Sequence, residues 1–382
     1  MRTTKRSRRL YFVPAFLAGI LALFLAMMPS VALAADGPLI GNFNTVSQIA
    51  STVPANGDQN PYGIVTVPTS IGKLVRGDIL VSNFNNNGAN GGEQGTGTTI
   101  VEISPSGKVS LFAQISASKL PGACPGGVGL TTALVALRRG WVIVGSLPTA
   151  DGTSATAKAG CLIVLNSNGQ PVETFSGGVI NGPWDMTALD LDRFAVLFFT
   201  NVLNGTVAAS PNTVNKGTVV RLVLEVPQQG YGRPSREDTT VIGSAFAERT
   251  DPAALVVGPT GVGLDFNGTL YVADSVNSRI AAIPYALTRE SSAGAGITVS
   301  SGGAINDPLG LTIAPNGNIL SANGNDGNIV ETTRGGRQVA HKLVDNTGGT
   351  GAGCLFGLTV TPGRSSVYFV DDCANALDLL HH

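Results

Sequence analysis

The sequence has 382 residues, of which 50 are glycine, and only 13% of the residues are charged. Because 43% of the residues are apolar, the chain can bury a core, which excludes a disordered protein. Abundant glycine with sparse charge is typical of many short strands joined by tight turns.

The N-terminus has the features of an export signal. Basic residues precede an apolar stretch over residues 10–28, and Ala32-Leu33-Ala34 fits a cleavage site. We therefore expect residues 1–34 to be a signal peptide and residues 35–382 to be one domain of an exported protein, either periplasmic or secreted. Two alternatives stay open. The apolar stretch is long enough for an uncleaved membrane anchor, and Arg8-Arg9 fits a twin-arginine signal as well as an ordinary secretory one.

The mature chain is mildly acidic. Removal of the first 34 residues takes five positive charges and no negative ones, leaving 19 Lys and Arg against 25 Asp and Glu, a net charge of −6. No basic stripe remains for a nucleic-acid backbone, so no nucleic-acid partner is expected. After cleavage no membrane span is expected either, and we expect a monomer.

Six repeat units follow one another along the mature chain. Each has an apolar strand, a turn and a second apolar strand that ends in a small or polar residue, which is a hairpin signature. The N-terminal units pair residues 63–67 with 79–83, residues 129–130 with 141–144, and residues 185–188 with 194–201. The C-terminal units cover residues 263–274, 310–323 and 357–371, and their leading glycines stand 47 residues apart.

The last unit lacks a fourth strand. It ends with residues 376–380, whereas the mature N-terminus offers a spare strand at residues 45–50. A ring of sheets has to hide its last edge, and a blade cannot bury both faces alone. The sequence therefore predicts an all-β, six-bladed β-propeller with four-stranded antiparallel blades, whose last blade is completed by the N-terminal strand.

These repeats resemble those of the NHL-repeat and gluconolactonase-like six-bladed propellers. The resemblance covers nearly all of the mature chain and is most specific over residues 259–373. It implies the fold, and it leaves the activity open because this fold hosts binders and enzymes alike.

The four cysteines take matching places in two units. Cys124 and Cys354 precede a first strand, and Cys161 and Cys373 lie at the following turn between the second and third strands. These places meet at one end of a meander, so we predict the pairs Cys124–Cys161 and Cys354–Cys373, which export allows.

Candidate ligand-binding residues come from the ends of second strands and from positions just before first strands, which would circle one mouth of the channel. Trp184 and Asp185 interrupt the repeat and are the strongest candidates, although Asn and Asp at strand ends also shape turns. Three long loops on the same face, residues 84–98, 147–160 and 202–217, offer a lid or recognition surface. The candidates are Tyr62, Asn83, Trp184, Asp185, Asn201, Asp274, Asn323, Phe356 and Asp371.

Catalytic and metal chemistry has few candidates in the sequence. Of three histidines, only His341 is internal, which disfavours a histidine-based triad or zinc site. Gluconolactonase-like enzymes hold a divalent cation by Glu, Asn and Asp, several of which lie just before first strands. In this sequence, most positions just before first strands hold residues that are poor ligands for a divalent cation. We predict no cofactor, and if a metal binds, its ligands are Asp185, Asp274 and Asp371, with calcium between Asp274, Asn323 and Asp371 as the option.

Two functions therefore compete. The first is an exported, non-catalytic propeller that binds a small molecule, glycan or protein on its loop-rich channel face. The alternative is a divalent-metal-assisted hydrolase or lyase of the gluconolactonase-like type, with ligands around Asp185 and Asp274. The small number of acid–base groups in the sequence favours the first function.

Overall fold

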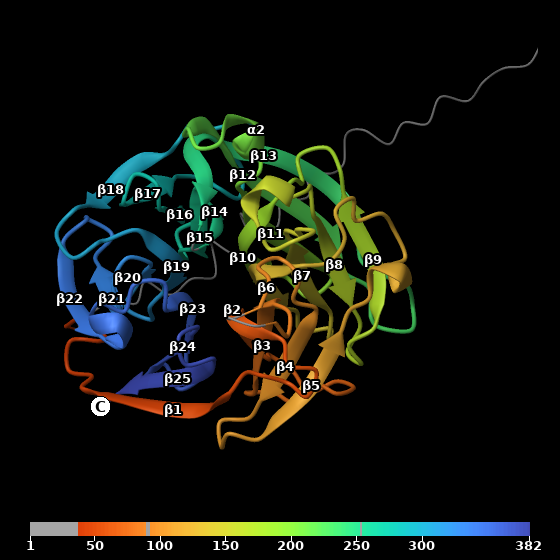
Figure 1. Cartoon of the computed structure of the whole chain (residues 1–382), viewed down its shortest axis with the longest axis horizontal. Helices are drawn as coiled ribbons and strands as arrows, with labels where there is room; N and C mark the ends of the chain where they lie inside the picture. The colour runs from red at the N-terminus through yellow and green to blue at the C-terminus, as the bar shows by residue number, and fades with distance from the viewer. Residues whose placement is uncertain (1–36, 89–91, 253) are drawn as a thin grey trace, which may run out of the picture.

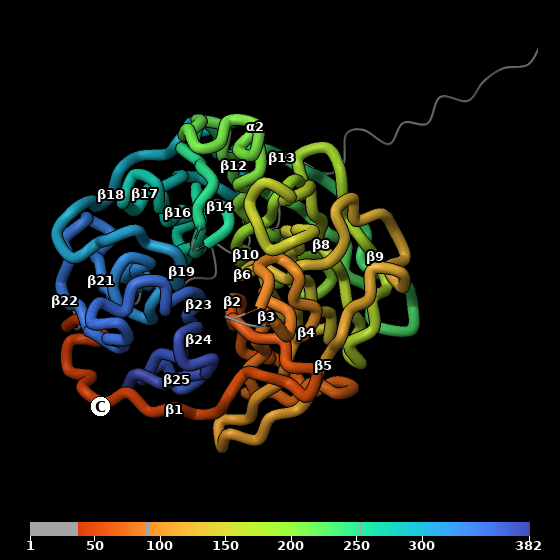
Figure 2. The backbone as a smooth tube through the Cα atoms, in the orientation of Figure 1, coloured from red at the N-terminus to blue at the C-terminus, as the bar shows by residue number. Residues whose placement is uncertain are grey.

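The computed structural model describes residues 37–88, 92–252 and 254–382. Six antiparallel sheets stand around a central axis (Figure 1), which confirms the six-bladed propeller expected from the repeats. The backbone runs round the ring once, and its first and last described strands lie side by side (Figure 2).

Each blade runs outward from a strand beside the axis. Blade 1 has β2 (Gln59–Thr66), β3 (Ile79–Asn85), β4 (Thr99–Ile103) and β5 (Val109–Gln114). Blade 2 has β6 (Leu130–Ala136), β7 (Val142–Ser146), β8 (Cys161–Leu165) and β9 (Pro171–Ser176). Blade 3 has β10 (Pro183–Asp190), β11 (Phe194–Asn201), β12 (Val214–Glu225), β13 (Ser235–Asp251) and β14 (Leu255–Val257).

The other three blades are more regular. Blade 4 has β15 (Pro259–Leu264), β16 (Leu270–Asp274), β17 (Arg279–Ile283) and β18 (Ile297–Ser301). Blade 5 has β19 (Pro308–Ile313), β20 (Ile319–Asn323), β21 (Asn328–Thr332) and β22 (Gln338–Leu343). Blade 6 has β23 (Leu355–Val360), β24 (Val367–Asp371), β25 (Ala376–His381) and β1 (Thr45–Ser51). Helical turns occur at η2 (Ala117–Lys119), η3 (Ser154–Thr156), α2 (Thr206–Ala209) and η4 (Thr347–Gly349).

The ring is closed by its N-terminal strand, as the sequence predicts. Strand β1 pairs antiparallel with β25, from Thr45 opposite His381 to Ser51 opposite Ala376. Just upstream, the backbone N–H groups of Leu39 and Ile40 each donate to the buried Glu331 carboxylate at 2.9 Å. The N-terminal segment therefore covers the free edge of blade 6 and is fixed to blade 5 as well.

Blade 3 carries a fifth strand that the repeats did not predict. After the long strand β13 the chain turns back, and β14 pairs with its end. The residues of β14 are buried against side chains from the inner strands of other blades. This short strand therefore covers one mouth of the axial channel.

One position of each inner strand lies where neighbouring blades approach most closely. Counting from the strand pairings, it is held by Gly63, Asp185, Gly261, Gly310 and Gly357, with Thr132 and Ala133 in blade 2. We call these positions the ring positions. The sequence pattern aligned Gly263 of blade 4 with Gly310 and Gly357, at equal intervals of 47 residues. The strand pairings instead make Gly261 the counterpart, so the interval of 47 residues holds only between blades 5 and 6.

Close backbone packing explains the glycines. A Cβ at Gly357 would lie 2.5 Å from the Tyr62 carbonyl oxygen of blade 1, and one at Gly261 would lie 2.5 Å from the Leu309 carbonyl oxygen of blade 5. These distances are shorter than nonbonded contacts allow, so a side chain there forces the blades apart.

Gly357→Ala is expected to lower the free energy of unfolding by about 1–3 kcal/mol, because the new methyl group overlaps the next blade. Urea denaturation measures the change. Gly335→Ala is the matched control, since its Cβ would find nothing nearer than 3.9 Å. Equal stability of the two variants would contradict this explanation of the ring glycines.

Both predicted disulfides are present, Cys124–Cys161 and Cys354–Cys373. Disulfides persist in oxidising compartments, so the two bonds fit an exported protein. The predicted signal peptide, residues 1–34, lies outside the described residues. Within the described part of the chain, no helix has the length and apolar character needed to cross a bilayer.

Candidate active site

The channel mouth at the start of the inner strands is filled by aromatic side chains. The ring of Tyr62 stacks on Phe84 at 4.4 Å and on Phe356 at 3.8 Å between centroids. The indole N–H of Trp184 donates to the Val256 carbonyl oxygen of β14 at 3.1 Å. We call these four aromatic residues and β14 the plug. All four aromatic side chains are 2% exposed or less, so this mouth is closed.

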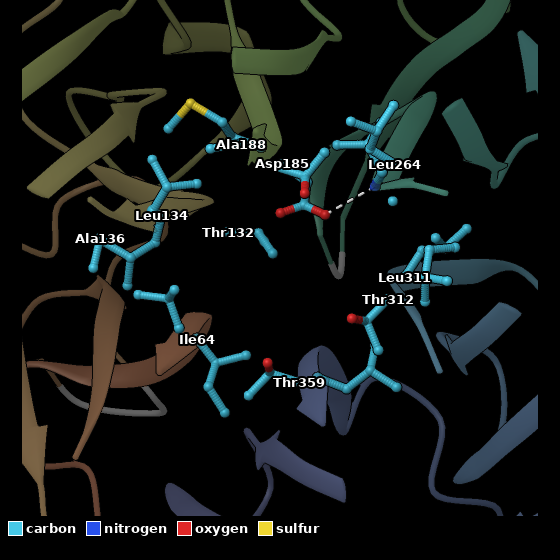
Figure 3. A pocket seen from close by; sticks show the side chains of 18 residues that line it. Ile64, Thr132, Leu134, Ala136, Asp185, Ala188, Leu264, Leu311, Thr312 and Thr359 are labelled. Carbon is cyan, nitrogen blue, oxygen red and sulfur yellow. Dashed lines mark hydrogen bonds between the residues drawn. The ribbon is translucent and has the colours of Figure 1, made fainter. Parts of the chain in front are cut away.

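A cavity of about 290 Å³ occupies the channel below the plug (Figure 3). Side chains from the inner strands of all six blades line it, and most of them are aliphatic. Exposure rises along the strands away from the plug; in β10, for example, Asp185 and Met186 are buried while Thr187 and Ala188 are partly exposed. The cavity therefore opens at the far ends of the inner strands, on the face opposite the one predicted for the binding site.

Asp185 is the single ionisable residue among the described residues that line this cavity. It occupies a ring position, where four other blades have glycine. The pairing of β10 with β11 shifts between Pro183 and Met186, and such a bulge re-aims side chains. Trp184 thus points into the plug, whereas the Asp185 carboxyl group points into the cavity (Figure 3).

Asp185 is held firmly from two blades. Its backbone N–H donates to the Thr200 hydroxyl at 3.1 Å, and Thr200 donates in turn to the Thr260 carbonyl oxygen of blade 4 at 2.8 Å. Its Oδ2 accepts from the Val262 N–H at 3.0 Å. Burial raises the pKa of Asp185 to about 8, although the backbone N–H groups of Met186 and Val262 lower it in part. At neutral pH the group is therefore a protonated carboxyl, which can donate a hydrogen bond or a proton.

Threonine hydroxyls supply the other polar groups of the cavity. Thr132 lies at the ring position of blade 2, next to blade 3, and its buried hydroxyl has no hydrogen-bond partner within the described structure. Thr312 and Thr359 face the same space from blades 5 and 6 (Figure 3). Sequence reasoning missed all three, although the repeated Gly-Leu-Thr of residues 310–312 and 357–359 alternates toward the channel and was a usable signal.

Of the predicted ligand-binding residues, Asp185 alone lines the cavity. Tyr62, Trp184 and Phe356 come together in the plug. The residues at second-strand ends are buried and bonded to nearby loops. Asn83 donates to the Thr52 carbonyl oxygen at 3.0 Å, and Asn201 and Asn323 donate to those of Val179 and Ala304 at 2.9 and 2.8 Å. Asp274 accepts from Arg279 at 2.7 Å, and Asp371 accepts from the Ala374 N–H at 2.9 Å.

The cavity does not supply the ligands that a hard divalent cation needs. Calcium takes six to eight oxygen ligands, usually with several carboxylates, and the described lining contains one carboxyl group. Across the described residues, one group of three ligating side chains lies close together, Asp345, Cys354 and Cys373, and both cysteines belong to a disulfide. The side chains of the cavity therefore do not fit the metal centre that a gluconolactonase-like enzyme would carry there.

The raised pKa of Asp185 makes a prediction about stability. Below about pH 4 both folded and unfolded chains carry a protonated Asp185. Between there and about pH 8 only the folded chain keeps the proton, so this contribution to stability is lost as pH rises. In that range Asp185 makes the free energy of unfolding fall by about 1.4 kcal/mol for each pH unit, and Asp185→Asn should abolish this fall. Denaturant titrations at several pH values test this, and identical slopes would contradict the buried carboxyl group.

Fold and cavity together define the class: a six-bladed propeller with one buried carboxyl group on its axis. The sequence matches no protein-family model, and no curated protein matches it. Solved structures do match. A luciferin-regenerating enzyme is 11% identical over 88% of this chain and 95% of its own, with a TM-score of 0.54. A gluconolactonase from Xanthomonas campestris is 13% identical over 90% and 96%, with a TM-score of 0.51. Regucalcin, a calcium-binding protein from Agrobacterium tumefaciens, is 12% identical over 86% and 92%, with a TM-score of 0.47.

At these identities the likeness establishes the fold, and gluconolactonase-like propellers are structural neighbours of the chain; the NHL-repeat resemblance stays a prediction. The neighbours also correct the expected function. A non-catalytic binding protein, the first expectation, is wrong by this comparison, because the luciferin-regenerating enzyme and the gluconolactonase, both with TM-scores above 0.5, are named as enzymes.

Proposed function

We propose that the chain is a hydrolase or lyase whose reaction takes place in the axial cavity, with Asp185 as the general acid. The main support for this proposal is that blade 3 differs from the others at the ring position. Four blades have glycine there, whereas blade 3 places a buried carboxyl group in the cavity. Burial raises the pKa of this group to about 8, so it keeps its proton near neutral pH. A general acid works best with its pKa near the working pH.

The chemistry of the cavity favours an uncharged substrate. None of the described lining residues carries a positive charge, so an anionic group would find no partner there. Aliphatic walls suit a compact apolar ring, and the threonine hydroxyls suit its oxygen atoms. Because a gluconolactonase is a structural neighbour, we take a neutral lactone as the substrate class.

Hydrolysis then needs two groups of this chain. Water adds to the carbonyl carbon to give a tetrahedral adduct. The bond between that carbon and the ring oxygen then breaks while the Asp185 carboxyl group donates its proton to the ring oxygen, and the proton that the added water loses passes to the Asp185 carboxylate. The Thr132 hydroxyl, which lacks a partner in the described structure, holds a substrate oxygen. The product is the open-chain hydroxy acid, which loses its proton to the solvent at neutral pH, and the resulting negative charge disfavours its retention in the cavity.

Turnover of a panel of γ- and δ-lactones, aldonolactones included, tests this proposal, with release of acid measured by a pH indicator. We expect activity on at least one neutral lactone and a decline above pH 8, as Asp185 loses its proton. No turnover of any lactone or simple ester, or a rate that keeps rising through about pH 9, would overturn it.

We further propose that residues 35–382 act as a single exported domain after removal of residues 1–34. Two disulfides support export. We also propose that the chain acts as a monomer on a small molecule held in the cavity. Mass spectrometry of the protein recovered from the exporting cell tests the first point: an N-terminus near residue 35 is expected, and retention of residues 1–34 would favour a membrane anchor.

A further inference from the structure

The connections between strands fall on two faces of the ring. In an antiparallel blade, the connection between the first and second strands and the one between the third and fourth strands lie at the same end. In this chain that end is the face where the inner strands finish and the axial cavity opens. We call these connections the open-face turns. The other connections, including those that join one blade to the next, lie on the face of the plug.

The two faces carry opposite charge. The open-face turns contain eleven Lys and Arg against four Asp and Glu, a balance of +7. The described connections on the plug face contain two Lys against seven Asp and Glu, a balance of −5. The net charge of −6 for the whole mature chain therefore hides a separation of charge across the ring. Such a separation gives the open face a positive potential.

More than half of these basic side chains are exposed without an ion pair. Nearby carboxylates hold four of the eleven in ion pairs, namely Arg139, Arg193, Arg233 and Arg334. Six others are exposed and form no ion pair with another described residue: Lys73, Arg76, Lys108, Arg138, Arg337 and Arg364. Their charge can therefore act on an anionic partner outside the chain.

The same face exposes aromatic side chains. Among the described residues, three Phe or Tyr side chains are more than half exposed, Phe266 at 54%, Tyr285 at 76% and Tyr231 at 85%. All three lie in open-face turns. Phe266 follows Leu264 of the cavity lining by two residues, so its turn borders the cavity opening. A soluble polyanion offers no apolar layer to such side chains, whereas the boundary between lipid headgroups and acyl chains accepts aromatic rings beside basic groups.

We propose that the open face docks on an anionic lipid bilayer, with the basic side chains of its turns at the headgroups and Tyr231, Phe266 and Tyr285 at the interface. Each basic group near such a surface adds to the attraction, and burial of the aromatic rings adds to the binding. Docking places the cavity opening against the bilayer, so a neutral apolar molecule dissolved there reaches the cavity directly. This surface lies outside the cavity and does not depend on the proposed reaction of Asp185.

Co-sedimentation of the mature chain, residues 35–382, with vesicles of phosphatidylcholine and phosphatidylglycerol tests the surface. We expect binding at low salt that weakens as sodium chloride is added, and little binding to vesicles of phosphatidylcholine alone. Arg76→Glu combined with Arg337→Glu should lower the partition coefficient for the anionic vesicles at least about tenfold. Tyr231→Ser should lower it about threefold or more, because less apolar surface is then buried at the interface.

Lys119→Glu combined with Lys158→Glu is the matched control, since it changes the net charge equally through two exposed lysines on the plug face. This control and Asp185→Asn should both bind the vesicles nearly as the unchanged chain does, and thermal unfolding checks that each variant is folded. Absence of binding to the anionic vesicles would overturn the proposal. Equal loss of binding in the two double variants would also overturn it, as would binding to dextran sulfate without binding to vesicles.

Discussion

Asp185→Asn is expected to reduce turnover of the substrate by about 100- to 10,000-fold, the range that positioned general acids contribute. The amide keeps the size of the side chain and its hydrogen bond to the Val262 N–H, but it has no acidic proton to give. Initial rates at saturating and limiting substrate separate the effect: a fall in kcat with little change in KM is expected, because binding contacts remain.

Asp185→Gly provides a control that the fold itself suggests. Four blades carry glycine at this ring position, so the variant should fold with all six blades intact and still be inactive. Thr132→Val, which removes the unpartnered hydroxyl, should raise KM more than it lowers kcat. Full activity in Asp185→Asn or Asp185→Gly would show that the reaction, if any, lies outside the cavity.

Deletion of residues 37–51 should lower the free energy of unfolding by at least about 5 kcal/mol, a large part of the stability of an ordinary domain. The deletion exposes the edge of β25 and removes Ile40 and Phe43, which are buried against blades 5 and 6. It also takes away two of the donors to Glu331 and leaves that buried carboxylate bonded to Asn316 and Asn318 alone among the described residues.

Thermal and urea unfolding of a chain that begins at residue 52, beside one that begins at residue 37, measures this loss. We expect the shorter chain to melt far lower or to lose its cooperative transition. Ser106→Ala, in an exposed turn of blade 1, should leave the transition unchanged. A shorter chain that unfolds like the longer one would show that the ring does not depend on its N-terminal strand.

The fold was predictable because the hairpin pattern that forms each blade occurs six times in the sequence. Each blade carries an apolar hairpin with a turn residue and a strand end in the same place, so six weak signals reinforce one another. The closing strand followed from a missing fourth strand, and the disulfides followed from the register. The fifth strand of blade 3 was not predictable, because Leu255–Val257 is a single apolar run that matches no repeat and is held by contacts with distant inner strands.

The site was predictable only in part. Asp185 stood out because it interrupts a repeat. Its direction depends on a register shift near the start of the inner strand, which recurs in all six blades but which the apolar pattern did not reveal. The aromatic residues Tyr62, Trp184 and Phe356 looked like a rim and are buried together instead. Whether such residues line a mouth or close it depends on side-chain packing across three blades, and a single sequence does not encode that packing as a local signal.

The protonation state of Asp185 offers the most direct test of its role as a general acid. Infrared difference spectra between the unchanged chain and Asp185→Asn isolate the carbonyl band of this one group. We predict a protonated-carboxyl band at neutral pH that disappears as the pH passes about 8. A carboxylate band at neutral pH, with no protonated form above about pH 5, would contradict a general acid at this position.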